Sequence, residues 1–443
     1  MDEKKGLLEI ASGSLWVLLG TIMGYILEYA NKIIIARFFG PSDYGVISLA
    51  LTFSMLAISF SLLGLHTGAA RFIAVYMAKN EISKVKSVIT QGLKIILSTS
   101  LFFSICFFFG KEFIISYFIK KPGVEKVILP FILSIPIAVT AEYLYSCLRG
   151  LKLAKYAIFS KEVMRRLITL IVLLIGVFIS KNLSFVALSY LIGFIGYMFI
   201  TALFINKGIS YNKYATQNNL DTIQIRELLS FSLPLVFSFI LMQFGAQMNN
   251  IFLGYYRTST EVGLFSAALS FSKIISLPLT IVLFMFLPVM SEYWRKNQIV
   301  EMEKVFKIIC RWLFVVSGLI FVIFVFFSEF LIINSLGEKF RPAYKALIIL
   351  SIGQFFSTIC GPTGALLLAL GESKKYFIAD LISIILSLIL YFIFGSKINY
   401  IGAAYISMSQ TITRNVFWLI FTYKLIKILP LKLHPLLNFF KIG

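Results

Sequence analysis

The sequence predicts an all-α integral membrane protein of about twelve transmembrane helices. Of its 443 residues, 59% are hydrophobic and only 14% are charged, whereas a soluble domain carries about 25% charged residues. Apolar runs near the ~20 residues needed to cross a hydrocarbon core recur along the chain. Because these runs are near-uniformly apolar and do not alternate, they fit helices and not the strands of a membrane barrel.

The expected helices follow one another with short connections. They cover about 13–36, 45–67, 88–109, 127–147, 162–180, 184–206, 228–254, 262–288, 306–328, 344–369, 376–395 and 399–422. Several contain or end at prolines, and an inner proline removes a backbone hydrogen bond and permits a kink. Pro278, in the eighth helix, is therefore a candidate gating position, with a static kink as the alternative.

The distribution of positive charge predicts the orientation. Twelve crossings place both termini on one side of the membrane. Assigning that side to the cytoplasm puts 27 of the 41 lysines and arginines there and 11 on the other side, which is the positive-inside pattern. The sequence thus predicts a multi-pass protein of the cell (cytoplasmic) membrane with both termini cytoplasmic. This pattern accounts for the formal charge of +21, so no nucleic-acid partner is expected.

The chain also repeats itself once. Residues 33–50 align without a gap on residues 251–268, and Gly45 falls on Gly263. Duplication of six helices gives two parallel repeats with the same orientation, related by an axis along the membrane normal. The predicted domains are an N-lobe at 1–206, a cytoplasmic linker at 207–227 and a C-lobe at 228–443.

Five segments carry a resemblance to a known family. They read IIIARFFGPSDYGVISLA, LGLHTGAARFIAVYMAKNE, FSLPLVFSFI, IFLGYYRTSTEVGLFSAALSFS and LLLALGESKKY. Together they resemble the polysaccharide-transporter (Wzx-like oligosaccharide flippase) branch of the multidrug/oligosaccharidyl-lipid/polysaccharide (MOP) exporter superfamily, from about residue 10 to about residue 425. The resemblance implies a MATE-like fold of two six-helix bundles around a central cavity. It also implies a flippase that translocates lipid-diphosphate-linked oligosaccharides by alternating access, for surface polysaccharide or glycan assembly.

Three cations lie inside predicted helices, where a charge costs several kcal/mol unless it faces protein or water. They are Lys32, Lys273 and Arg414. Cationic side chains in a cavity would replace the lost hydration of a diphosphate, and we expect these three to bind it. For Lys32 the alternative is an ion pair with Glu28, four residues earlier on the same helix face. For Arg414 the alternative is a structural role within the polar patch around it.

Polar side chains on the seventh helix are further candidates. Gln243, Gln247 and Asn250 are suited to sugar hydroxyls, although such amides also bond helix to helix. Asn249-Asn250 stand where family members often carry an acidic residue, which weakens ion coupling there. Arg71, at the cytoplasmic end of the second helix, is expected either to meet an incoming headgroup or to act as a positive-inside anchor.

Glu28 and Glu142 are the acidic residues within predicted helices that we consider for a coupling ion. Glu142 is equally suited to pair with a basic side chain of a neighbouring helix. No cofactor is expected, and an H⁺ or Na⁺ gradient stays open as the energy source. The expected partners are the lipid-linked oligosaccharide and membrane lipid, with polysaccharide assembly proteins as an open addition.

Catalysis and metal binding have no sequence signature. The four cysteines stand singly without metal-ligand spacing, and no catalytic motif occurs, so we expect no catalytic residue, no metal site and no enzyme activity. A multidrug/cation antiporter of the same superfamily is the first alternative, and it predicts acidic residues in the cavity. A membrane glycosyltransferase or polymerase would show a large outer loop or paired acidic residues. A lipid II flippase is a narrower option.

Overall fold

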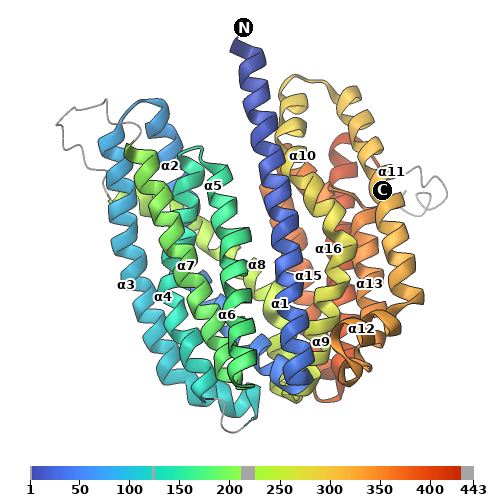
Figure 1. Ribbon diagram of the computed structural model, residues 1–443. Helices are drawn as coiled ribbons and strands as arrows, with labels where there is room; N and C mark the ends of the chain where they lie inside the picture. The colour runs from blue at the N-terminus through green and yellow to red at the C-terminus, as the bar shows by residue number, and fades with distance from the viewer. Residues whose placement is uncertain (1, 122–124, 211–224, 431–443) are drawn as a thin grey trace. The chain divides into compact units, whose positions relative to one another are not determined.

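The computed structural model describes residues 2–121, 125–210 and 225–430 (Figure 1). Across those three ranges every regular element is a helix and none is a strand. In hydrocarbon, the backbone N–H and C=O groups can be satisfied only within a helix or a closed barrel. The predicted all-α membrane fold is confirmed.

The helices follow the order of the predicted ranges. In the first part of the chain they are α1 (Asp2–Ser61), α2 (Leu65–Ala78), α3 (Ile82–Ile114), η1 (Ile115–Ile119), α4 (Glu125–Gly150), α5 (Ala154–Ile158), η2 (Phe159–Met164), α6 (Arg165–Ile179), α7 (Leu183–Ser210), α8 (Ile225–Tyr256) and α9 (Ser259–Ser272). In the second part they are η3 (Lys273–Ser276), α10 (Leu277–Arg295), α11 (Ile299–Phe326), α12 (Ser328–Leu336), η4 (Glu338–Phe340), α13 (Ala343–Ile359), α14 (Thr363–Ala369), α15 (Ser373–Phe394), η5 (Gly395–Lys397) and α16 (Tyr400–Ile426).

The first two predicted helices share one element. Within α1, Gly40 has φ 76° and breaks the helical geometry immediately before Pro41. Glycine adopts positive φ without the clash that a Cβ would cause, so the chain bends here without a loop. The second predicted helix, 45–67, bends again at Gly64 (φ 67°), after which α2 begins.

Nine segments among the described residues are long and apolar enough to cross a membrane. One of them, Trp16–Ser61, holds the first two predicted helices. The predicted helices at 162–180 and 399–422 lie outside these nine and correspond to α6 and α16. All twelve predicted ranges therefore coincide with helices.

The fifth helical stretch corrects the predicted boundary. The chain is helical from Ala154 through α5, η2 and α6, so the stretch begins before residue 162. Lys161, Arg165 and Arg166, which the charge pattern assigned to the cytoplasmic side, lie within this helical stretch. Carboxylates on other turns and other helices pair with Lys161 and Arg166 there.

Contacts between residues divide the chain into two compact units, 1–263 and 264–443. In the first unit, α8 packs against α1 and α2. The predicted linker at 207–227 falls largely on residues 211–224, which lie outside the described residues. Since the units reflect packing and the repeat reflects duplication, the predicted lobe boundary stays a prediction.

Helices α1 and α9 meet in the first unit through residues that are equivalent in the sequence repeat. A Cβ on Gly45 would lie 1.7 Å from the carbonyl oxygen of Ser259, and one on Gly263 would lie 1.9 Å from that of Pro41. Pro41 and Ser259 are themselves equivalent in the alignment. Each copy of the repeated segment thus presents its glycine to the backbone of the other copy, in a reciprocal contact.

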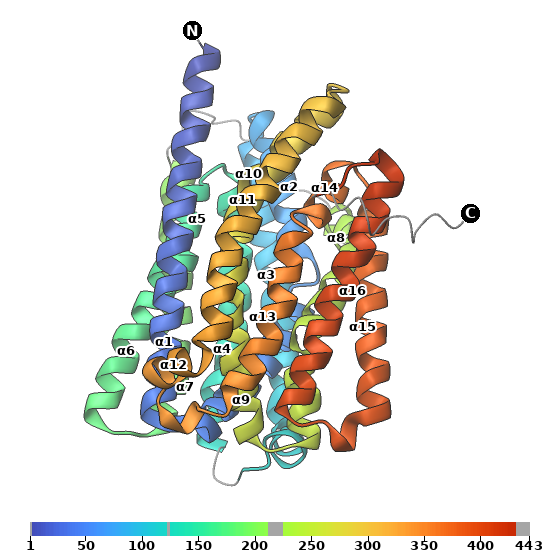
Figure 2. The same ribbon diagram turned by 90° about the vertical axis from the view of Figure 1, so that its right-hand side faces the viewer.

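Each unit has its own packed interior. In the first, α4 packs between α3 and α7 (Figure 1), and the Tyr143 hydroxyl donates to the Val88 carbonyl at 2.8 Å. In the second, α16 packs against both α13 and α15 (Figure 2). There Phe286, Met290 and Phe306 belong to one buried cluster. These interiors fix the helices that carry the charged side chains.

Candidate functional site

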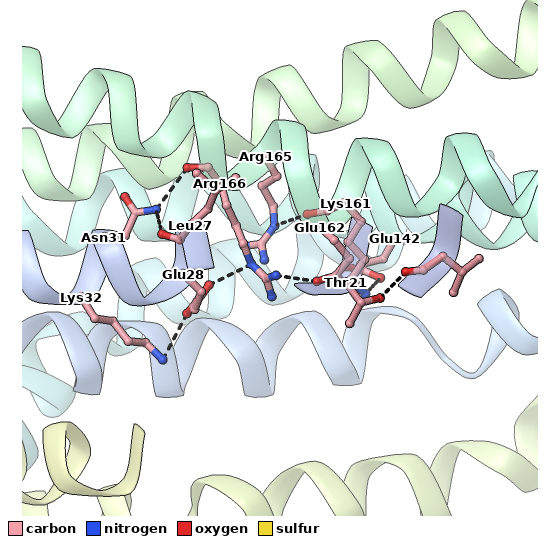
Figure 3. A network of polar contacts seen from close by, with 11 residues as sticks. Thr21, Leu27, Glu28, Asn31, Lys32, Glu142, Lys161, Glu162, Arg165 and Arg166 are labelled. Carbon is pink, nitrogen blue, oxygen red and sulfur yellow. Dashed lines mark hydrogen bonds and ion pairs between the residues drawn. The ribbon is translucent and has the colours of Figure 1, made fainter. Parts of the chain in front are cut away.

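Charged side chains in the first unit converge between α1 and the start of α6 (Figure 3). Glu28 pairs with Lys32 at 3.2 Å and with the Nε of Arg166 at 3.0 Å. Arg166 also pairs with Glu162 at 2.6 Å. We call Glu28, Lys32, Glu162 and Arg166 the Glu28 network. Glu28 lies ~18 Å along α1 from Trp16, at 1.5 Å per residue, so the network is well inside the predicted span.

Small and polar residues on α1 make room for Arg166. A Cβ on Gly24 would lie 2.4 Å from Nη1 of Arg166 and 2.8 Å from the Glu162 carbonyl oxygen. The Asn31 amide donates to the backbone carbonyl of Arg166 at 3.1 Å and to that of Leu27 at 3.0 Å (Figure 3). Arg166 is thereby held on both its backbone and its guanidinium group, and its side chain is only 13% exposed.

A second ion pair lies close to the network. Lys161 of η2 donates to Glu142 of α4 at 2.8 Å, and its ammonium lies 4.7 Å from the ring centroid of Tyr145. Arg165 donates to the Lys161 carbonyl at 3.4 Å and lies over Phe194.

The charged groups around η2 are not balanced. The Glu28 network together with Glu142, Lys161 and Arg165 holds four cations and three carboxylates. Burying a charge is costly unless it is paired, so the carboxylates stabilise the buried cations. The set as a whole keeps a positive charge.

The structure shows the ion pairs that the sequence offered as alternatives for Lys32 and Glu142. The Lys32–Glu28 pair predicted from the i,i+4 spacing is confirmed. Glu142 has the basic partner that was its alternative, Lys161. Roles in substrate binding or ion coupling stay predictions for all three residues.

Sequence reasoning missed Arg166 and Glu162. Both lie in the predicted helix 162–180, where Glu162 is the first residue and Arg166 was counted only as a charge on the cytoplasmic side. Their i,i+4 spacing was the available signal. The pair between Arg166 and Glu28 could not be predicted in this way, because Glu28 lies on a distant part of the chain.

The candidate amides of α8 bond helix to helix. The Thr52 hydroxyl on α1 donates to the Gln247 side-chain oxygen at 3.0 Å, and the Asn250 amide donates to that hydroxyl at 3.1 Å. Gln243 is half-buried on the same helix, and Arg71 is exposed on α2. Their roles in sugar binding and headgroup access stay predictions.

In the second unit Arg414 has an acidic partner that the sequence analysis did not single out. Its Nε lies 3.8 Å from Asp380 of α15, whose side chain is 8% exposed. At this distance the pair is too long for a hydrogen bond. The guanidinium also lies 5.0 Å from the Trp418 ring, which stacks on Tyr376. Asp380 is thus more deeply buried than Glu28 and Glu142, the two carboxylates considered from the sequence.

The two remaining candidates lie at a helix junction. Lys273 begins the short 3₁₀ turn η3 and is exposed. Pro278 occupies the first turn of α10, where its missing N–H breaks no helical hydrogen bond. The predicted eighth helix therefore changes helix type at η3. Gating at Pro278 stays a prediction.

Comparisons with known proteins place the chain in a family. The sequence model of the family described as "Polysaccharide biosynthesis protein" matches residues 10–294, and that of the MatE family matches residues 234–393. An uncharacterized membrane protein of Methanocaldococcus jannaschii is 24% identical over 363 residues, which cover 78% of this chain and 70% of that protein.

Two solved structures share the fold. An inward-facing multidrug resistance MATE family transporter of the MOP superfamily superposes with a TM-score of 0.76 at 15% identity, over 94% of this chain and 98% of that one. The lipid II flippase MurJ, in an inward closed conformation, superposes with a TM-score of 0.72 at 21% identity, over 92% and 87%. The expected MATE-like fold of twelve helices is confirmed.

The family match covers more than half of the chain, and both structural neighbours are transporters or flippases. This chain is a multi-pass membrane protein with a MATE-like fold, and it belongs to the family described as "Polysaccharide biosynthesis protein".

Proposed function

We propose that this protein is a flippase that moves lipid-diphosphate-linked oligosaccharides across the cytoplasmic membrane by alternating access, for surface polysaccharide or glycan assembly. Family membership supports the general class. The observation that carries the choice of substrate is the surplus of cations over carboxylates among the embedded charges of the first unit. Both termini are proposed to be cytoplasmic, and assembly proteins are proposed partners.

The physical argument concerns the headgroup. A diphosphate carries negative charge that must leave water, and charge-assisted hydrogen bonds from lysine and arginine compensate for that loss. Within the Glu28 network, Arg166 is held by two carboxylates, whereas Lys32 has one and is 26% exposed. We therefore propose Lys32 as the cation that contacts the headgroup, and Arg166 as the residue that positions Glu28.

Ion coupling is a separate part of the proposal. Glu28 and Glu142 each have a cation within 3.2 Å, so H⁺ or Na⁺ binding there would have to displace a lysine or arginine. Coupled transport at either site therefore predicts that the ion pair breaks during the cycle.

A multidrug/cation antiporter is the second candidate, and Asp380 is the observation that favours it. This carboxylate is buried but paired only loosely with Arg414, and it lies in the part of the chain that matches the MatE family. An organic cation requires an available carboxylate. The carboxylates of the Glu28 network, by contrast, are paired within 3.2 Å.

The test is flipping of a fluorescent lipid-diphosphate oligosaccharide in proteoliposomes. We expect Lys32→Gln to slow flipping about tenfold, because a hydrogen bond to a charged group contributes about 1.5–3 kcal/mol. Lys273→Gln and Arg414→Gln test the other proposed contacts in the same assay. Lys296→Gln is the matched control, since Lys296 is exposed and pairs with Glu292 on the same helix.

Each outcome separates the candidates. Flipping that all three variants retain at the wild-type rate would remove the proposed headgroup contacts. If the wild type moves no lipid-linked sugar but exchanges an organic cation for H⁺ or Na⁺, and Asp380→Asn stops the exchange, the antiporter is the correct assignment.

A further inference from the structure

An apolar cavity lies on the first unit, and none of the charged side chains of the Glu28 network lines it. Its volume is about 440 Å³, within the range of small-molecule sites. It lies between three parts of the chain: residues 16–23 of α1, the α5–η2 stretch and the C-terminal part of α7. Its walls are side chains of Leu19, Met23, Phe159, Val163 and Phe204. The polar groups of the lining belong to Trp16, Lys155 and Tyr156, and the other walls are apolar and favour a hydrocarbon chain.

One side of the cavity carries a cation. The Lys155 ammonium lies 4.3 Å from the ring centroid of Trp16, and both residues line the cavity. Trp16 is 55% exposed. Tryptophan is enriched at the level of lipid headgroups, and lysine extends its charged end towards that level while its stem packs on apolar surface. Apolar walls with a lysine and a tryptophan beside them match one hydrocarbon chain and one anionic headgroup.

The local backbone explains why a hollow forms here. Helix α1 passes close to α5 at Gly20, where a Cβ would lie 2.9 Å from a methyl group of Ile158. The glycine leaves the floor of the cavity without a side chain. The π-helical turn η2 supplies the opposite wall through Phe159 and Val163. Such turns are frequent at functional sites.

We propose that this cavity binds one chain of an anionic membrane phospholipid, with the lipid phosphate at Lys155. Charge complementarity selects this occupant. Arg149, in the last turn of α4, and Lys152, on the connection to α5, precede Lys155 and are exposed, and clustered basic residues beside a membrane attract anionic lipid. The site is separate from the proposed headgroup contacts, so the inference does not depend on the proposed function.

Trp16 allows the site to be observed directly. Phospholipids with brominated chains quench tryptophan fluorescence on contact. Trp294 and Trp312 would be replaced by Phe, and Trp418 kept because it stacks on Tyr376. The same protein with Trp16→Phe gives the fluorescence of Trp418 alone, which is subtracted. The probes are brominated phosphatidylglycerol and brominated phosphatidylcholine with identical chains, in vesicles of the purified full-length protein.

We expect phosphatidylglycerol to quench Trp16 with about fivefold higher apparent affinity than phosphatidylcholine, the preference that one lysine near the surface provides. Lys155→Gln should abolish this preference. Lys152→Gln, which removes an exposed charge three residues away, should retain it. Val163→Phe should reduce quenching by both lipids, since it fills the cavity and leaves the charge in place.

Three results would overturn the proposal. Equal quenching by the two lipids in the wild type would mean ordinary contact with the bilayer, and no quenching of Trp16 would mean that no chain enters. If a polyprenyl phosphate relieves the quenching at a lower mole fraction than unbrominated phosphatidylglycerol, the cavity holds the chain of a transported lipid instead. Lys155 is exposed, so its variant tests the charge even if Val163→Phe does not fold.

Discussion

Two arginines in this protein, Arg166 and Arg414, differ in how tightly their carboxylate partners hold them. Arg166 pairs with Glu28 and Glu162 within 3.0 Å, and Asn31 binds its backbone carbonyl. Arg414 pairs with Asp380 only at 3.8 Å and lies over Trp418. The first is held on several sides and is suited to a fixed structural role. The second can exchange its partner at less cost.

Replacement of Arg166 should therefore destabilise the first unit. We expect Arg166→Gln to lower the free energy of unfolding by about 3–5 kcal/mol, because Glu28 and Glu162 lose their shared buried partner. Lys32→Gln should cost less, since Glu28 keeps Arg166. Thermal unfolding in detergent, followed by loss of monodisperse protein, measures the order. Equal unfolding temperatures for both variants would contradict the structural role of Arg166.

At the level of helices, the crossing of α1 and α9 depends on two glycines. Gly45 and Gly263 each face a backbone carbonyl of the other helix at a distance that no Cβ tolerates. A backbone carbonyl cannot swing aside as a flexible side chain can, so the helices themselves would have to separate. Equivalence in the repeat makes the two positions a natural pair for comparison.

We expect Gly45→Ala and Gly263→Ala each to destabilise the protein by about 3 kcal/mol or more, the upper range for overpacking. Gly110 of α3 is the matched control, because a Cβ there would meet nothing within 4 Å. Gly110→Ala should be neutral or slightly stabilising, as alanine is favoured over glycine within a helix. Unfolding temperatures of the three variants give the comparison, and a neutral Gly45→Ala would contradict the close crossing.

For the molecule as a whole, the embedded position of Lys161, Arg165 and Arg166 lowers the number of lysines and arginines on the cytoplasmic side. It does not change which side holds more of them. These cations no longer count towards the cytoplasmic side, and that side still holds the clear majority of the lysines and arginines. The predicted orientation therefore continues to follow from the positive-inside pattern.

Orientation can be tested with two exposed residues on either side of the α11–α12 stretch. In a protein without its native cysteines, Lys296→Cys should react with a membrane-impermeant maleimide only after the cells are opened. Lys339→Cys should react in intact cells, because the chain crosses the membrane between the two positions. The reverse pattern would invert the topology, and labelling of both in intact cells would remove the crossing at α11.

The sequence by itself determined the helices, the duplication and the family. Hydropathy is a property of consecutive residues, so the twelve ranges could be read without knowing the packing. The pair Glu28–Lys32 was equally accessible, because four residues bring two side chains to one face of a helix. The family motifs are local as well, being turn and helix-packing patterns within short segments.

Only the tertiary structure decided which charges meet across helices. Glu28 pairs with Arg166 on α6, Glu142 pairs with Lys161 on η2, and Arg414 pairs with Asp380 on α15. Those partnerships depend on how separate helices pack, which hydropathy does not encode. The fifth helical stretch also begins earlier than predicted, at Ala154, and Lys155 and Lys161 lower the hydropathy of that part of the chain. The apolar cavity is likewise a property of three packed helices and of no single one.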